Sequence, residues 1–208
     1  MASKEHYHTH FEEGGFYHIY NRTIDSKPMF KNEGNYLFFL QKFDKYLSEV
    51  LDVYVYCLLD NHFHFLVRIK DGCDLTSFKI KHQLPENVSA HEMISKQLRI
   101  FFQSYALAFN KQQNRIGTLF QRPFKRVWID NMDYFTTLIY YIHSNPQKHN
   151  LASDFRLWKW SSYHALISSK TTKIKRKEVM DWFGDVHQFI VFHNSGKFLI
   201  NTTFALED

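Results

Sequence analysis

The stretch of sequence that decides the fold is Val53-Tyr-Val-Tyr-Cys-Leu-Leu-Asp-Asn-His-Phe-His-Phe-Leu-Val-Arg-Ile69. It is rich in β-branched and aromatic residues, and the Asp-Asn pair near its centre is typical of a tight turn. The pattern therefore predicts two adjoining strands, over residues 53–59 and 62–70. Residues two apart on a strand point to the same side of a sheet, so His62 and His64 are expected to share one face.

The flanking segments complete a regular order of elements. Partial alternation of aromatic residues predicts a strand over residues 15–23, and apolar residues at three- and four-residue steps predict helices over 32–51 and 90–113. A fourth strand is expected over 126–130. The order strand, helix, strand, strand, helix, strand predicts an α+β fold of the ferredoxin-like βαββαβ type. This is an antiparallel sheet with both helices on one face.

The remaining segments predict smaller helical elements. Residues 71–90 carry scattered polar residues, a glycine and a proline, which indicates a loop with a short helix. A further helix is expected over 133–143, closed by Ser144-Asn145-Pro146. Short helices are expected around 178–183 and 186–193.

One catalytic domain with two additions is the expected organisation. The first residues, 1–14, are polar and are predicted to be flexible. The domain itself is predicted over 15–150. Residues 151–208 are predicted to form a helical C-terminal extension that packs on the domain or continues it.

The composition permits a polyanionic partner without requiring one. The 208 residues carry 26 Lys and Arg against 21 Asp and Glu, a formal net charge of +5. No apolar run approaches the roughly 20 residues that span a bilayer, and the chain does not open on an apolar signal segment. We therefore expect a cytoplasmic protein without a membrane partner. The two cysteines form no CxxC pair and no disulfide framework.

The His62/His64 pair is a candidate metal site. Neutral imidazole is a common ligand of divalent metals. A lone His-x-His is a weak signal in a chain with 13 histidines, and a pair of hydrogen-bonded sheet histidines is the alternative. The expected shared face of the sheet favours the metal site.

A basic segment follows the second long helix. Over residues 114–126, basic side chains alternate with Leu and Phe: Arg115, Arg122, Lys125 and Arg126. A solvated loop is one interpretation, and a surface that grips phosphates beside aromatic rings is the other. A second basic cluster lies over residues 170–177 and is equally compatible with simple solvation.

Six motifs occur in a recognisable order. They are Tyr20-Asn-Arg22, Asp60-Asn-His-Phe-His-Phe-Leu-Val67, Ser104-Tyr-Ala-Leu-Ala-Phe-Asn110, Gly117-Thr-Leu-Phe-Gln-Arg-Pro-Phe-Lys125, Tyr141-Ile-His-Ser-Asn-Pro146 and Trp160-Ser-Ser-Tyr163. Their order and spacing resemble the HUH-type tyrosine transposases of the insertion-sequence class. The REP-associated branch is the closer match, because the chain continues through the Trp-Ser-Ser-Tyr segment.

The resemblance implies a transposase that nicks and rejoins single-stranded, hairpin-containing DNA. It implies Mg²⁺ or Mn²⁺ at the histidine pair and Tyr105 as the nucleophile that forms a 5′-phosphotyrosine link. Tyr105 also fits a core position, because it falls on the apolar stripe of its helix. The expected DNA-binding residues are Arg22, Arg115, Arg122, Lys125 and Arg126.

The third metal ligand departs from the family pattern. Shorter relatives supply it from a polar side chain one helical turn after the tyrosine, where this chain has Phe109. Asn110 is the next candidate, although five residues on a helix turn about 140°, against about 40° for four. Water or a DNA phosphate are the alternatives.

Other assemblies and functions stay open at this point. Both homodimers and monomers occur among the relatives. A hairpin-DNA-binding protein without cleavage, and a metal-dependent nuclease that activates water, are the competing functions.

Overall fold

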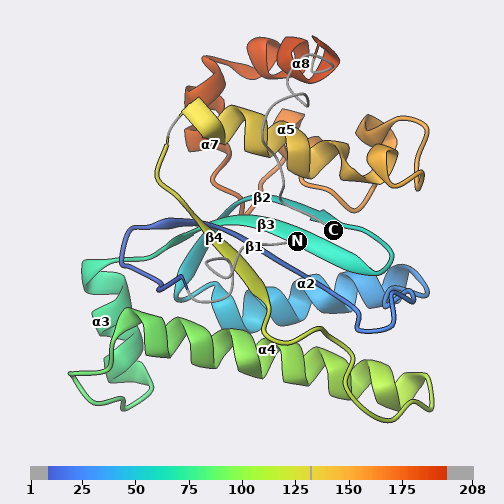
Figure 1. Cartoon of the computed structure of the whole chain (residues 1–208). Coiled ribbons are helices and arrows are strands. Elements are labelled where there is room, and N and C mark those ends of the chain that lie inside the picture. The colour runs from blue at the N-terminus through green and yellow to red at the C-terminus, as the bar shows by residue number, and fades with distance from the viewer. Residues whose placement is uncertain (1–8, 132, 196–208) are drawn as a thin grey trace.

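The structure, a computed structural model, describes residues 9–131 and 133–195 and is built around one four-stranded sheet. The strands are β1 (Phe16–Arg22), β2 (Leu51–Leu58), β3 (His62–Ile69) and β4 (Lys125–Ile129). Their order across the sheet is β2-β3-β1-β4, and every neighbouring pair is antiparallel. This is the ferredoxin-like order, so the predicted α+β fold is confirmed (Figure 1).

Two long helices cover one face of the sheet. Figure 1 shows α2 (Glu33–Leu47) and α4 (Ala90–Gln112) below the strands, with α3 (Gly72–Lys81) beside them. Helix α4 begins at a capping box, in which the Ser89 and Glu92 side chains bond to each other's backbone N–H groups. An aromatic-rich core fills the space between these helices and the sheet.

The second face of the sheet is covered by α5 (Asp133–Lys148) and by the C-terminal extension. The described part of the extension contains a short 3-10 turn and three helices: η1 (Phe155–Leu157), α6 (Tyr163–Ile167), α7 (Arg176–Phe183) and α8 (Val186–Ser195). Their apolar side chains share one buried cluster with α5 and with Val55 and Leu66 of the sheet. The two predicted short helices correspond to α7 and α8, above the sheet in Figure 1.

Helix α5 is longer than the sequence predicts. The expected end at residue 143 is wrong, because the helix passes through Pro146 and ends at Lys148. Proline has no N–H and removes one helical hydrogen bond, which is tolerable this close to the helix end. The turn continues with a bond from His149 N–H to Asn145 O. This additional turn carries Lys148 and His149 toward the sheet.

The start of the described chain is packed against the domain. Residues 1–8 of the predicted flexible segment lie outside the described residues. Phe11, however, is buried, and Arg126 donates a hydrogen bond to Thr9 O. Among the described residues, no helix combines the length and apolar character needed to span a membrane.

Candidate active site

Two histidines of β3 face α5 and are held by specific hydrogen bonds. His62 and His64 are both buried, with ring centroids 5.3 Å apart. His64 Nδ1 lies 3.0 Å from His18 Nε2, and His62 Nδ1 lies 2.6 Å from Asn61 Oδ1. The Asn61 amide nitrogen donates to Ser26 O, so its oxygen is the atom that faces His62. His62 Nδ1 therefore carries the proton, and the lone pair is on Nε2.

Both imidazoles are neutral at physiological pH. Burial, aided by the nearby positive charge of Arg22 and Lys148, lowers the pKa of His62 to about 2 and the pKa of His64 to about 3. His62 Nε2 is buried and accepts no hydrogen bond from any described residue. A buried, neutral imidazole nitrogen of this kind is suited to a metal ligand.

Helix α5 brings a tyrosine and a third histidine to the pair. The ring of Tyr141 meets that of His64 edge-on, with centroids 5.8 Å apart. The ring of His149 lies 4.7 Å from that of His62, and Lys148 Nζ lies 5.3 Å from the centre of the Tyr141 ring. Tyr141 and His149 are eight residues apart, slightly more than two helical turns, and His149 directly follows the last residue of α5.

These two residues are the ones that reasoning from sequence missed. Tyr141 opens the Tyr-Ile-His-Ser-Asn-Pro motif, and that position was an available signal. His149 lies beyond the proline that was expected to end the helix. If the predicted helix had continued through Pro146, it would have led from Tyr141 to His149, and both could have been assigned to the sheet histidines.

A small cavity adjoins His62. Its volume is about 20 Å³, enough for one water-sized occupant. It is lined by Tyr20, Asn21, Arg22, His62, Gln121, Lys125 and His149. The Arg22 Nε atom is buried without a hydrogen-bond partner among the described residues. A water-sized space lined by the imidazoles of His62 and His149 and by two cationic side chains suits one small ligand, such as a metal ion or a single phosphate oxygen.

Few protein side chains near this cavity are available as ligands of a metal ion. Across residues 9–131 and 133–195, no three His, Cys, Asp or Glu side chains form a group that could hold a metal ion. A divalent cation held by His62 and His64 would therefore take water or phosphate oxygens as further ligands, as Mg²⁺ commonly does.

Tyr105 lies on the other side of the sheet. It belongs to the core formed with α2, packs edge-on against Phe39 and donates a hydrogen bond from its hydroxyl to Met29 O at 2.8 Å. Burial raises the pKa of its hydroxyl well above the usual value. The structure thus does not bring Tyr105 together with the histidines, and its place on the apolar stripe of α4 explains why.

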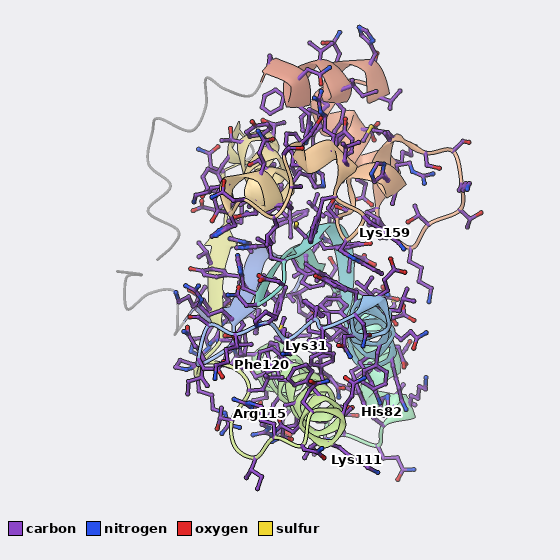
Figure 2. All side chains as sticks on the ribbon, turned by 90° about the vertical axis from the view of Figure 1, so that its right-hand side faces the viewer. Lys31, His82, Lys111, Arg115, Phe120 and Lys159 are labelled. Carbon is purple, nitrogen blue, oxygen red and sulfur yellow. The ribbon has the colours of Figure 1, made fainter. Side chains whose placement is uncertain are left out.

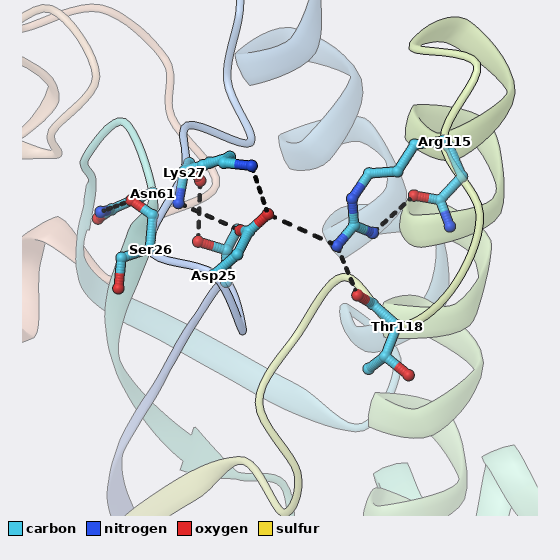
Figure 3. A network of polar contacts seen from close by, with 8 residues as sticks. Asp25, Ser26, Lys27, Asn61, Arg115 and Thr118 are labelled. Atoms are coloured by element: carbon cyan, nitrogen blue, oxygen red, sulfur yellow. Dashed lines mark hydrogen bonds and ion pairs between the residues drawn. The ribbon is translucent and has the colours of Figure 1, made fainter.

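Asn110 and Arg115 close the end of α4 instead of reaching the histidines. Asn110 Nδ2 donates to Gly117 O, and Asn110 Oδ1 accepts from Arg115. Arg115 also donates to Thr118 O and lies 3.9 Å from a carboxylate oxygen of Asp25 (Figure 3). In Figure 2, Arg115 is beside α4, on the opposite side of the sheet from α5.

The other predicted DNA-binding residues have different surroundings. Arg22 and Lys125 line the cavity, as described above. Arg122 is exposed beside α4, next to the cis bond that joins it to Pro123. Arg126 is buried between the rings of Phe11 and Phe124, so it packs against the first described residues and does not line the cavity.

Comparison with known proteins identifies a related fold. No family model matches the chain, and no curated protein matches it. One solved structure with a similar fold is a REP-associated tyrosine transposase bound to a REP hairpin. The match has a TM-score of 0.55 and covers 85% of this chain and 96% of that chain, at 16% sequence identity. At this identity the similarity shows a shared fold.

Proposed function

We propose that the protein is a metal-dependent DNA transposase that nicks and rejoins single-stranded, hairpin-containing DNA through a 5′-phosphotyrosine intermediate. The observation that carries the proposal is the contact of Tyr141 with His64, whose neighbour His62 lines a cavity together with Arg22 and Lys125. The fold shared with a hairpin-bound tyrosine transposase supports DNA as the partner. A homodimer stays a prediction.

Tyr141 replaces Tyr105 as the proposed nucleophile. Its ring lies near His64 and next to the ammonium group of Lys148. Tyr105 has neither neighbour, and its hydroxyl is engaged by a backbone carbonyl in the core.

His62 and His64 are the proposed ligands of Mg²⁺ or Mn²⁺. A bound divalent ion would polarise a phosphoryl oxygen and offset the charge that develops during attack. Asn61 and His18 would hold the two rings in place, since each bonds to the Nδ1 atom of one of them. His149 is the nearest further imidazole to His62.

The proposed reaction transfers a phosphoryl group from a 3′-oxygen of the DNA to the Tyr141 oxygen, so that one phosphate ester replaces another. The Tyr141 oxygen forms a bond to phosphorus and gives up its proton. The bond between phosphorus and the 3′-oxygen breaks, and that oxygen takes up a proton to become a 3′-OH. Arg22 and Lys125 would hold the phosphate during this exchange. Attack by a 3′-OH reverses the step and rejoins the strand.

Two tyrosine variants test the proposal. Wild-type protein is incubated with labelled hairpin DNA that carries a single-stranded flank and with Mn²⁺, and a denaturant-resistant protein–DNA adduct is sought. We expect the adduct to disappear in Tyr141→Phe and to persist in Tyr105→Phe. An adduct that survives Tyr141→Phe would falsify the assignment. DNA binding without cleavage in the wild type would indicate a hairpin-binding protein instead.

A further inference from the structure

A buried chain of hydrogen bonds links α5 to β2 and to α8, away from the histidines of β3. His143 of α5 lies 2.8 Å from Ser162 Oγ through Nε2 and 3.0 Å from His193 Nε2 through Nδ1. His193 Nδ1 in turn lies 2.8 Å from Phe189 O. At the other end, Ser162 Oγ accepts from Tyr56 N–H at 2.9 Å. Ser162, His143 and His193 are all buried.

The hydrogen-bonding groups at the two ends of this chain determine which ring nitrogens of His143 and His193 carry a proton. A carbonyl can only accept, so His193 Nδ1 carries a proton and its Nε2 accepts from His143 Nδ1–H. His143 Nε2 then accepts from the Ser162 hydroxyl. A reversed chain would require a protonated His193, which burial opposes by lowering its pKa to about 4. The Ser162 hydroxyl also lies 3.2 Å from Tyr56 O, a second acceptor, and each ring N–H of the neutral chain has one acceptor.

This chain connects the helix of the proposed nucleophile to the strand beside the proposed ligands. His143 is two residues from Tyr141 on α5, and His149 directly follows the helix, six residues beyond His143. Tyr56 precedes Cys57, which pairs with His64 in the sheet. A rotation or slide of α5 would stretch these hydrogen bonds and would also move the Tyr141 ring away from His64.

We infer that Ser162, His143 and His193 form a positioning relay that sets the location of Tyr141 relative to His64. The inference rests on the function proposed above. It gives the C-terminal extension a role in the reaction, because Ser162 and His193 both belong to it. None of the three residues touches the proposed DNA site, so the relay would act on the rate of attack and not on DNA binding.

Variants of the relay separate positioning from folding. Ser162→Ala and His193→Phe each remove one link, and we expect the single-turnover nicking rate to fall about 10- to 100-fold at unchanged DNA affinity. His193→Gln retains an amide that can donate to Phe189 O and accept from His143, and we expect it to recover most of the rate. His187→Phe, at an exposed position of the same helix, is the matched control and should nick like the wild type.

Each outcome bears on the relay. Wild-type rates in Ser162→Ala and His193→Phe overturn it, and so does a loss in His193→Gln as large as in His193→Phe. A wild type that does not nick refutes the proposed function and the relay's part in it, whereas an active wild type with unaffected variants refutes the relay alone.

A measurement on the wild-type protein covers the case in which the variants do not fold. Nitrogen chemical shifts of labelled histidines report which ring nitrogen carries the proton. We expect His143 and His193 both to be neutral with the proton on Nδ1. A proton on Nε2 of either ring overturns the relay.

Discussion

Lys125 and Arg126 show how neighbouring basic residues differ in role. Lys125 lies at the cavity beside His62, with its Nζ 5.4 Å from the centre of the Tyr20 ring. Arg126, the next residue on the strand, points to the other face and is buried between two phenylalanine rings. The alternation of the strand thus divides one basic pair into a candidate phosphate contact and a core residue.

Removing Lys125 should weaken DNA binding in a salt-dependent way. For Lys125→Ala we expect lower affinity for hairpin DNA and a slope of log affinity against log salt that is reduced by about 1, since one phosphate contact is lost. Binding is measured at several salt concentrations. Lys111→Ala, at an exposed lysine on α4 across the sheet from α5, is the control (Figure 2). An unchanged slope in Lys125→Ala would show that this lysine contacts no phosphate.

Helix α5 contributes Tyr141 to the site and His143 to the relay. The buried histidines of the relay, His143 on α5 and His193 on α8, make stability depend on pH. Burial lowers the pKa of His193 to about 4 and holds the pKa of His143 well below its usual value. The unfolded chain, with histidine pKa values near 6.5, therefore binds more protons than the folded chain between about pH 6.5 and pH 4. The contribution of these neutral, buried histidines to the free energy of unfolding is fully present above about pH 6.5 and is lost as the pH falls toward 4.

This dependence predicts a measurable difference between pH 7 and pH 5. We expect His193 alone to account for a decrease of about 2 kcal/mol in the free energy of unfolding over that interval. Urea unfolding at the two pH values measures it. The decrease should be smaller in His193→Gln, which has no group that titrates there. An equal decrease in wild type and variant would contradict a neutral, buried His193.

The elements also show what could and could not be predicted from sequence. The period of two along β3 correctly placed His62 and His64 on one face, because alternation is a local property of the strand. It could not show which helix covers that face. Both α4 and α5 carry an apolar stripe with a tyrosine on it, and only the topology places Tyr141 over the histidines and Tyr105 on the far side.

Pro146 illustrates a second limit of local reasoning. A proline commonly marks a helix boundary, so the sequence predicts an end near residue 143. In the fold, α5 packs along the sheet and the extension, and this packing outweighs the one missing hydrogen bond. The missed turn leads to His149, which is why this site residue was missed with it.

At the scale of the whole molecule, the C-terminal extension belongs to the core. Phe189 of α8 is fully buried in the cluster that covers the second face of the sheet. Phe189→Ala should therefore lower the free energy of unfolding by roughly 3–5 kcal/mol, as expected for a large side chain removed from a packed core. Val191→Ala, at an exposed position of α8, should change it little. Urea unfolding of both variants measures the difference, and equal stabilities would contradict a shared core.

In the proposed reaction, Tyr141 of α5, placed beside His64, attacks DNA. The most direct measurement is to form the protein–DNA adduct with Mn²⁺ and a hairpin substrate, digest both components and locate the modified residue by mass spectrometry. We expect a nucleotide attached through its 5′-phosphate to Tyr141. A nucleotide on Tyr105, or on any other residue, would contradict it.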